Sequence, residues 1–83
     1  MGFIFGKYAI YLQFSDGTKG YFMAKRGDHV MTTSSFANAE KFSSHSAAES
    51  YFFKHDIGRG SNDNFARVTG AWSSTDGKFF RMG

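Results

Sequence analysis

The chain has 83 residues, no cysteine and a formal net charge of +3 at pH 7. This length indicates one domain over residues 1–83, and the lack of cysteine excludes a disulfide framework and a thiolate metal site. No apolar run approaches the length of about 18 residues that spans a membrane. We therefore expect a cytoplasmic protein that makes no membrane contact and needs no cofactor.

The N-terminal part of the chain predicts a β-hairpin followed by a third strand. Its Asp-Gly step supplies the positive φ angles that a tight hairpin turn needs. In the first strand, the face with Ile10, Leu12 and Phe14 alternates with the face of Ala9, Tyr11 and Gln13. The expected elements are a strand over 3–14, a turn over 15–18, a strand over 18–24, a turn over 25–28 and a short strand over 29–33.

A helix is predicted over residues 43–57, after a segment (34–42) whose Phe and Ala spacing allows a short helical turn. Ser44 is one candidate N-cap, and a capping box from Ser46 to Glu49 is the alternative. Gly58 suits the residue just past the helix end. The apolar stripe expected on this helix consists of Ala48, Tyr51, Phe52 and His55.

The C-terminal part predicts two more strands. The expected elements are a polar loop over 59–64, a strand over 65–72 with Gly70 as a weak point or bulge, a turn over 73–77 and a strand over 78–82. The fold class is therefore α+β. We expect a small antiparallel sheet of four to five strands in the order β-β-β-α-β-β, with one helix packed on one face.

The three histidines are the candidates for catalysis or metal binding. His45 and His55 would lie about 15 Å apart along one helix, so they cannot share one metal ion. No His-x-x-His pattern, Gly-x-Ser-x-Gly elbow or phosphate-binding glycine loop is present. A metal-free nuclease assembled from His29, His45 and His55 is one hypothesis, but a non-enzymatic protein is the favoured interpretation.

Aromatic residues interleaved with basic ones give the main functional signal. Eleven Phe, four Tyr and one Trp are more than one small core easily hides. Single-stranded nucleic acids bind where rings stack on bases and cations contact phosphates. The expected phosphate contacts are Lys25, Arg26, Lys54, Arg59 and Arg81, and the expected stacking rings are Phe53 and Tyr21.

Unpaired sheet edges, surplus aromatic residues and a small core predict a homodimer. A two-fold dimer would double the basic surface and widen any nucleic-acid footprint. The predicted partners are therefore RNA and a second copy of the chain. A host toxin or an RNA-processing protein is a further expected partner.

Residues 8–55 resemble a hairpin-plus-helix cassette of small phage-encoded accessory proteins. The segments that carry the resemblance are 8–12, 16–18, 21–22, 30–33, 38–44 and 47–51. The pattern is similar to the TifA-type RNA-binding inhibitors by which T4-like phages counter RNA-cleaving toxins. This resemblance implies RNA binding and an antidefence role in the infected cell, and it implies no catalytic residues.

Three hypotheses follow. The first is an RNA-binding inhibitor of a host RNA-cleaving toxin or a similar defence system. The second is a protein-only inhibitor that blocks a host enzyme through a sheet edge or an aromatic patch. The third is the small histidine-based nuclease described above.

Overall fold

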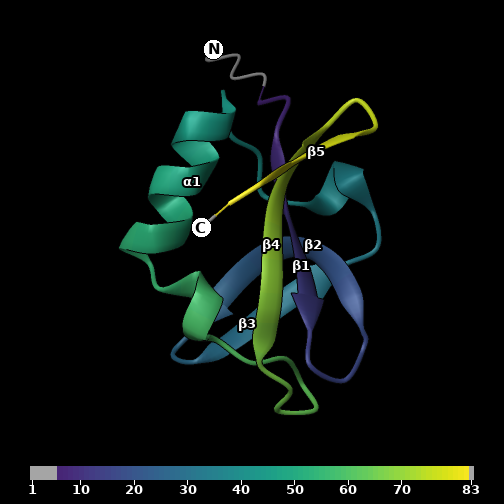
Figure 1. Cartoon of the computed structure of the whole chain (residues 1–83), viewed down its shortest axis with the longest axis vertical. Helices are drawn as coiled ribbons and strands as arrows, with labels where there is room; N and C mark the ends of the chain where they lie inside the picture. Colours follow the sequence, from purple (N-terminus) through teal and green to yellow (C-terminus); the bar gives the residue numbers. More distant parts are fainter. Residues whose placement is uncertain (1–5, 83) are drawn as a thin grey trace.

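The central strand of the fold is β1 (Ala9–Phe14). It pairs antiparallel with β2 (Lys19–Arg26) on one side and with β4 (Val68–Thr75) on the other. β3 (His29–Thr33) extends the sheet beyond β2, and β5 (Lys78–Arg81) extends it beyond β4. The computed structural model therefore shows one five-stranded sheet in the order β3-β2-β1-β4-β5 (Figure 1).

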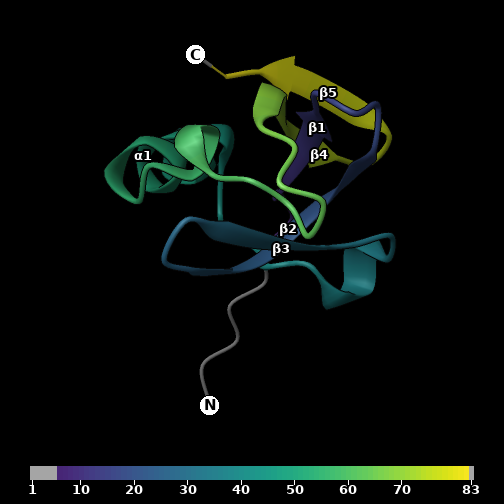
Figure 2. The same cartoon turned by 90° about the horizontal axis from the view of Figure 1, so that it is seen from below.

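In the part of the chain that the structure describes, one α-helix, α1 (His45–Lys54), packs against one face of this sheet (Figures 1 and 2). Two short 3-10 turns accompany it, η1 (Phe36–Asn38) before the helix and η2 (Ile57–Arg59) after it. The structure describes residues 6–82. The predicted α+β class and the order β-β-β-α-β-β are both confirmed within that range.

The hydrophobic core lies between α1 and the sheet. Alternate residues of β1 point into it, as the period of a half-covered strand requires. Helix α1 contributes Ala48 and Phe52, and η2 contributes Ile57. The largest side chains of the core that are shielded almost completely from solvent are Ile10, Leu12, Phe14, Phe22, Val30 and Ile57.

The N-terminal strands differ from their predicted bounds only at the ends. The regular part of the first strand begins at Ala9, and Tyr8 before it pairs with Phe42 in an isolated bridge. Residues 3–5 of the predicted strand lie outside the described residues. β2 continues beyond its predicted end through Arg26, so the second turn consists of Gly27 and Asp28 alone. Gly27 has a φ of 59°, which a two-residue hairpin turn demands.

Ser44 is the N-cap of α1, because its Oγ accepts a hydrogen bond from the backbone N–H of Ala47 at 3.0 Å. The alternative start at Ser46 was wrong. The predicted end near Ile57 was also wrong: the helix ends at Lys54, and Asp56 takes the left-handed conformation that was assigned to Gly58.

Gly58 is needed for packing instead. A side chain at this position would begin 2.8 Å from the ring of Phe52. The early end of the helix also leaves His55 exposed, so the predicted apolar stripe loses its last member.

The fourth strand begins at Val68, so the predicted start at Phe65 was wrong. Asn62 holds the preceding loop instead, because its side-chain oxygen accepts hydrogen bonds from the backbone N–H groups of Asn64 and Ala66 at 2.9 and 3.0 Å. This local arrangement keeps Phe65 out of the strand, with a φ of 64° and an exposed fraction of 82%.

The predicted turn over 73–77 is shorter in the structure. Ser73 and Ser74 are buried strand residues of β4, and the turn itself is Asp76-Gly77. Both turn residues have positive φ, which makes a tight two-residue hairpin. The weak point expected at Gly70 is present as a break in the register between β1 and β4.

Candidate nucleic-acid interface

The face of the sheet opposite the core carries a continuous cluster of aromatic rings. Tyr11 alternates with the core residues of β1 and stands opposite both Tyr21 and Trp72 on the neighbouring strands. Its ring centroid lies 5.0 Å from that of Tyr21 and 6.4 Å from that of Trp72. Phe79 of β5 lies 5.3 Å from Tyr11, and Phe36 of η1 lies 5.5 Å from Tyr21. We name these rings the aromatic platform.

The rings of the platform are held in place yet remain accessible. Tyr11 meets Tyr21 and Phe79 at interplanar angles of 65°, and Tyr21 meets Phe36 at 85°. Such edge-to-face contacts stabilise a pair of rings by about 0.5–1.5 kcal/mol. Phe79 is 49% exposed and the other rings are partly exposed. The platform is therefore a fixed aromatic surface that faces solvent.

Gly70 makes room for the indole ring of Trp72. The two residues lie on the same face of β4, since alternate residues of a strand share a face. A side chain at position 70 would begin 2.8 Å from the Trp72 ring. The missing side chain therefore lets the indole lie along the sheet beside Tyr11.

Cations surround the platform. The guanidinium of Arg81 lies 5.4 Å from the centroid of Trp72, and the ammonium of Lys41 lies 4.6 Å from that of Phe36. Lys19 stands opposite Gln13 on this same face of the sheet. The arrangement places positive charge around exposed rings, which is the pattern that binds a single-stranded nucleic acid.

A groove of about 940 Å³ runs beside the platform. Tyr21, Phe36 and Phe79 of the platform form part of its wall, and Lys7 and Lys78 are the basic residues of its lining. Asp76 is the acidic residue in its lining. The volume falls within the range of about 300–1,000 Å³ that is usual for small-molecule sites, so the groove is large enough for an unstacked nucleotide.

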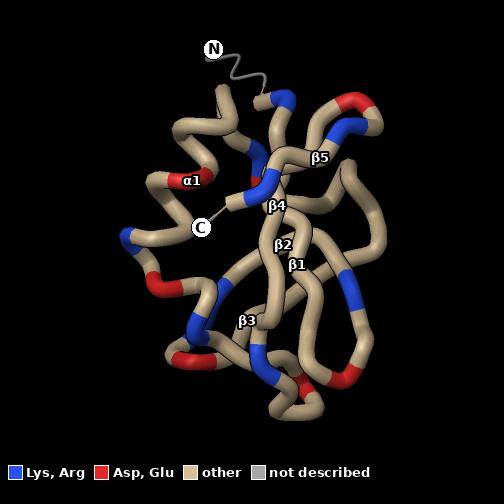
Figure 3. The backbone as a smooth tube through the Cα atoms, viewed as in Figure 1, with Lys and Arg blue, Asp and Glu red and all other residues tan. Residues whose placement is uncertain are grey.

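The structure divides the predicted binding residues between two regions. Tyr21 and Arg81 belong to the platform and its surround. Lys54 and Arg59 lie instead where α1 ends, and Lys25 of β2 reaches the same place (Figure 3). We name this second region the basic end; it consists of Lys25, Lys54 and Arg59. Arg26, the last residue of β2, stands opposite His29 of β3.

Lys25 has a structural contact at the basic end. Its ammonium donates hydrogen bonds to the backbone carbonyls of His55 at 2.6 Å and of Asp56 at 3.3 Å. A cation at this position satisfies the last carbonyls of a helix and favours the helix dipole. Asp56 also lies 3.7 Å from Arg59, so acidic and basic groups are mixed in this region.

Phe53 is 55% exposed and lies on α1 rather than on the platform. Its ring meets the edge of Phe52 at a centroid distance of 5.1 Å. Its exposure agrees with the sequence prediction, but within the described residues its ring has no other aromatic neighbour with which to form a stacking surface.

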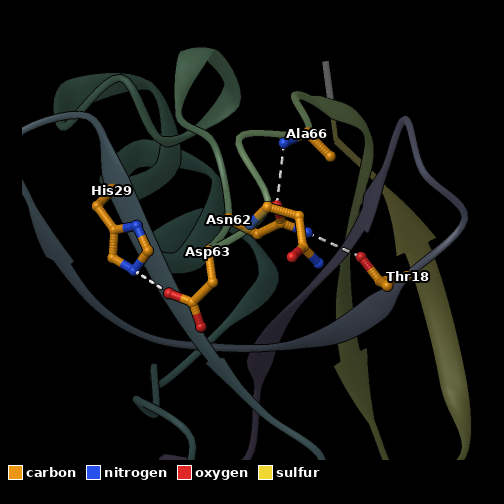
Figure 4. Close-up of polar contacts among 6 residues, drawn as sticks. Thr18, His29, Asn62, Asp63 and Ala66 are labelled. Atoms are coloured by element: carbon orange, nitrogen blue, oxygen red, sulfur yellow. Dashed lines mark hydrogen bonds and ion pairs between the residues drawn. The ribbon is translucent and has the colours of Figure 1, made fainter.

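The histidines each have a different partner. Nε2 of His29 lies 2.7 Å from a carboxylate oxygen of Asp63 (Figure 4). The ring of His55 packs on that of Tyr51, with 4.2 Å between the ring centroids. Nδ1 of His45 lies 2.5 Å from the hydroxyl of Ser73. Glu49 lies 3.9 Å from Nε2 of the same His45, so a carboxylate, an imidazole and a hydroxyl lie next to one another in that order. The side chain of Ser73, however, is fully buried. No substrate reaches this hydroxyl in the described fold.

The loop around Asn62 ties two distant turns together. The side-chain amide of Asn62 donates to the hydroxyl of Thr18 at 2.9 Å (Figure 4). Thr18 in turn donates to the carboxylate of Asp16 through its hydroxyl at 2.6 Å and its backbone N–H at 3.0 Å. These hydrogen bonds lower the pKa of Asp16. The network holds the exposed Phe65 at a fixed position on the loop.

Within residues 6–82 no group of His, Cys, Asp and Glu side chains is placed to hold a metal ion. The one α-helix in this range is too short and too polar to cross a membrane.

Sequence reasoning missed most of the platform. It assigned Tyr11 to the second face of the first strand but gave it no function, and it expected one of Phe79 and Phe80 to be core without deciding which. Trp72 was read only as the end of a strand. The available signal was the pair Gly70 and Trp72, because a glycine two residues before a tryptophan in a strand leaves space on the same face.

Comparisons of the chain with protein-family models, with curated proteins and with solved structures found no match.

Proposed function

We propose that this protein is a non-enzymatic RNA-binding protein that holds single-stranded RNA on the aromatic platform. The observation that carries the proposal is the cluster of Tyr11, Tyr21, Phe36, Trp72 and Phe79 on one open face of the sheet. Stacking of a base on an exposed ring stabilises a complex by about 1–3 kcal/mol. A few such contacts would suffice for micromolar affinity, which corresponds to about 8 kcal/mol.

The surrounding cations complete the proposed site. Arg81 and Lys41 lie beside rings of the platform, and Lys7 and Lys78 line the adjoining groove. Bases that stack on the rings would leave their phosphates within reach of these side chains. A duplex hides its base faces, so this surface favours unpaired strands.

The resemblance to phage inhibitors of RNA-cleaving toxins supports a more specific role. We propose that the bound RNA allows the protein to inhibit such a toxin in the cytoplasm of an infected cell. The same resemblance favours RNA over DNA.

Binding is tested with a fluorescein-labelled single-stranded RNA of about 12 nucleotides, a length within the range that such sheets occupy. Fluorescence anisotropy gives the affinity, and quenching of Trp72, the one tryptophan of the chain, reports contact with the platform. The same RNA in a blunt duplex and the equivalent single-stranded DNA are the comparison ligands. We expect tight binding of the single-stranded RNA and quenching on its addition.

Two variants locate the site. Trp72→Ala should weaken RNA binding by about 5- to 150-fold, which is the loss of one stacked base. Phe53→Ala removes an exposed ring outside the platform and should leave the affinity unchanged. Absence of single-stranded RNA binding would overturn the proposal, and so would an equal effect of the two variants.

Phe65 favours a second candidate function, the protein-only inhibitor of a host enzyme. Its ring is 82% exposed on a loop that hydrogen bonds hold in place, and such a ring can fill a pocket of a partner. Co-expression with an RNA-cleaving toxin separates the two functions. The RNA-dependent mechanism requires Trp72→Ala to lose rescue of cell growth, whereas the protein-only mechanism requires Phe65→Ser to lose it while Trp72→Ala retains it.

A further inference from the structure

The two edges of the sheet differ in how well they are covered. At the β3 edge, the backbone N–H of Val30 donates to the carbonyl of Ser61 at 2.7 Å, and His29 forms a bridge with the same residue. At the other edge, every residue of β5 is exposed, and no described segment pairs with the side of this strand that faces away from β4. β5 is therefore the edge that is open to another strand.

The hydrogen-bonding phase of β5 follows from its pairing with β4. The backbone N–H of Met82 donates to the carbonyl of Ala71 at 3.0 Å. Bonded and non-bonded pairs alternate along an antiparallel ladder, so Phe80 is bonded to Ser73, and Phe79 and Arg81 are not bonded to β4. The backbone N–H and C=O groups of Phe79 and Arg81 therefore point toward the open edge.

We infer that a second copy of the chain pairs with this edge, β5 against β5, about a two-fold axis that passes beside Phe80 and stands perpendicular to the sheet. In this register Phe79 of each copy lies opposite Arg81 of the other copy. Each such pair exchanges hydrogen bonds in both directions, so all the edge groups of Phe79 and Arg81 are satisfied. The two sheets become one ten-stranded sheet, twice the five strands of one chain.

The side chains of β5 suit this register. Phe79 is 49% exposed and Phe80 is 42% exposed, and the pairing covers both. Phe80 meets its own symmetry mate on the core side of the sheet. On the platform side, Phe79 lies opposite the guanidinium of Arg81, which is a favourable cross-strand pair of ring and cation.

Other registers fit less well. A shift of the axis to Phe79 would place Arg81 opposite Gly77, whose φ of 78° turns its backbone away from an extended strand. An axis between Phe79 and Phe80 would place Phe79 of one copy opposite Phe80 of the other. The backbone N–H and C=O of Phe79 would then face those of Phe80, which are already bonded to β4. In the proposed register Lys78 lies opposite Met82 and no like charges face each other.

The dimer also enlarges the proposed binding surface, a consequence that rests on the proposed function. A two-fold axis perpendicular to the sheet places both platforms on the same side. The rings of the two copies then adjoin across β5 and form one continuous surface. The pairing itself depends only on the edge, so it is tested in the absence of nucleic acid.

The chain contains no cysteine, which permits a clean crosslinking test. Two Cα atoms at a non-bonded antiparallel pair lie about 4.5 Å apart, within the range of about 4.4–6.8 Å that a disulfide spans. Under mild oxidation after nuclease treatment, Phe80→Cys should form a disulfide-linked dimer on a non-reducing gel. Phe53→Cys, at a position on α1 that is more exposed than Phe80, should remain a monomer.

A second pair of variants tests the backbone hydrogen bonds. Phe79→Pro and Phe79→Ala both remove the ring, but only proline removes the N–H that points to the open edge. Since that N–H is not bonded to β4, both variants should fold, which circular dichroism checks. Light scattering should give a dimer for the wild type, a weakened dimer for Phe79→Ala and a monomer for Phe79→Pro.

A monomeric wild type at every accessible concentration would overturn the inference. A dimer that persists in Phe79→Pro as in Phe79→Ala, or one in which Phe80→Cys does not crosslink, would overturn it as well, because the dimer would then use another surface. None of these outcomes depends on RNA. A monomer that binds single-stranded RNA would reject the dimer and leave the proposed function intact.

Discussion

The two faces of the sheet are built from the same strands but are covered in opposite ways. Phe22 and Tyr21 are neighbours in β2, yet Phe22 points under α1 with 1% of its surface exposed, while Tyr21 points into the open platform. The core face uses burial to stabilise the fold, and the platform face keeps its rings at the surface. Stability and ligand binding should therefore respond to different residues, even at adjacent positions of one strand.

The largest expected effect separates these neighbours. Phe22→Ala should lower the free energy of unfolding by about 3–5 kcal/mol, because it empties a filled core position. Tyr21→Ala should lower it by only about 1–2 kcal/mol, from the loss of edge-to-face contacts with Tyr11 and Phe36. Urea denaturation followed by circular dichroism measures both. Equal losses would show that the platform is part of the core.

The second prediction compares the platform with the basic end. Lys78→Gln with Arg81→Gln, and Lys54→Gln with Arg59→Gln, each remove the same charge. The first pair should weaken single-stranded RNA binding by about tenfold, or about 1.4 kcal/mol. It should also reduce the slope of log affinity against log salt by about 0.7 for each residue removed.

The second pair should leave that slope unchanged. Anisotropy titrations between about 50 and 200 mM salt measure the slopes. If Lys54→Gln with Arg59→Gln reduces the slope instead, the RNA phosphates contact the basic end, as the sequence predicted. The platform would then not be the main contact.

The third prediction concerns the helix end. Lys25→Met should destabilise the fold by about 1 kcal/mol, because the carbonyls of His55 and Asp56 lose their donor. Arg26→Gln is the matched control, since it removes the same charge from the next residue and should cost less than about 0.5 kcal/mol. Thermal melts measure both. Equal losses would mean that charge, rather than the contact with the helix, accounts for the effect.

The smallest expected effect is a pH dependence at Asp16. Hydrogen bonds from Thr18 lower the pKa of this carboxyl in the folded state. The folded carboxylate therefore keeps its charge to a lower pH than the unfolded one. The stability that it contributes is complete above about pH 4 and is lost as the pH falls through the lowered pKa.

Asp16→Asn should thus be less stable than the wild type at neutral pH, with a difference that shrinks in acid. Melts at several pH values measure this difference, and Asp76→Asn removes the same charge from another turn as the control. A difference between wild type and Asp16→Asn that stays constant down to the lowest pH would contradict the prediction.

Local patterns account for the parts of the fold that the sequence predicted. The Asp-Gly turns, the alternation in β1 and the Ser44 cap each depend on residues close together in the chain. The predicted end of the helix was wrong because Lys25, which is far away in the sequence, donates hydrogen bonds to the carbonyls of His55 and Asp56. The predicted start of the fourth strand at Phe65 was wrong because the side chain of Asn62 accepts hydrogen bonds from the backbone of this loop. An argument from strand propensity does not consider such contacts.

The candidate site was harder to predict because it depends on register. Tyr11, Tyr21 and Trp72 adjoin only once β2 and β4 have paired with opposite sides of β1. The sequence predicted the hairpin that joins β1 to β2, but it did not predict that β4 pairs with the other side of β1. It therefore grouped rings with cations that were near them along the chain, which brought together Phe53, Lys54 and Arg59 rather than the platform.

The central position of β1 has a consequence for how the chain is made. β1 and β2 are synthesised before β4, which covers the other side of β1 and begins only at Val68. At a synthesis rate of about 5–20 residues per second, the flank of the future central strand stays open for several seconds. During that time the nascent hairpin exposes unpaired backbone, and a chaperone or a neighbouring nascent chain can reach it before β4 does.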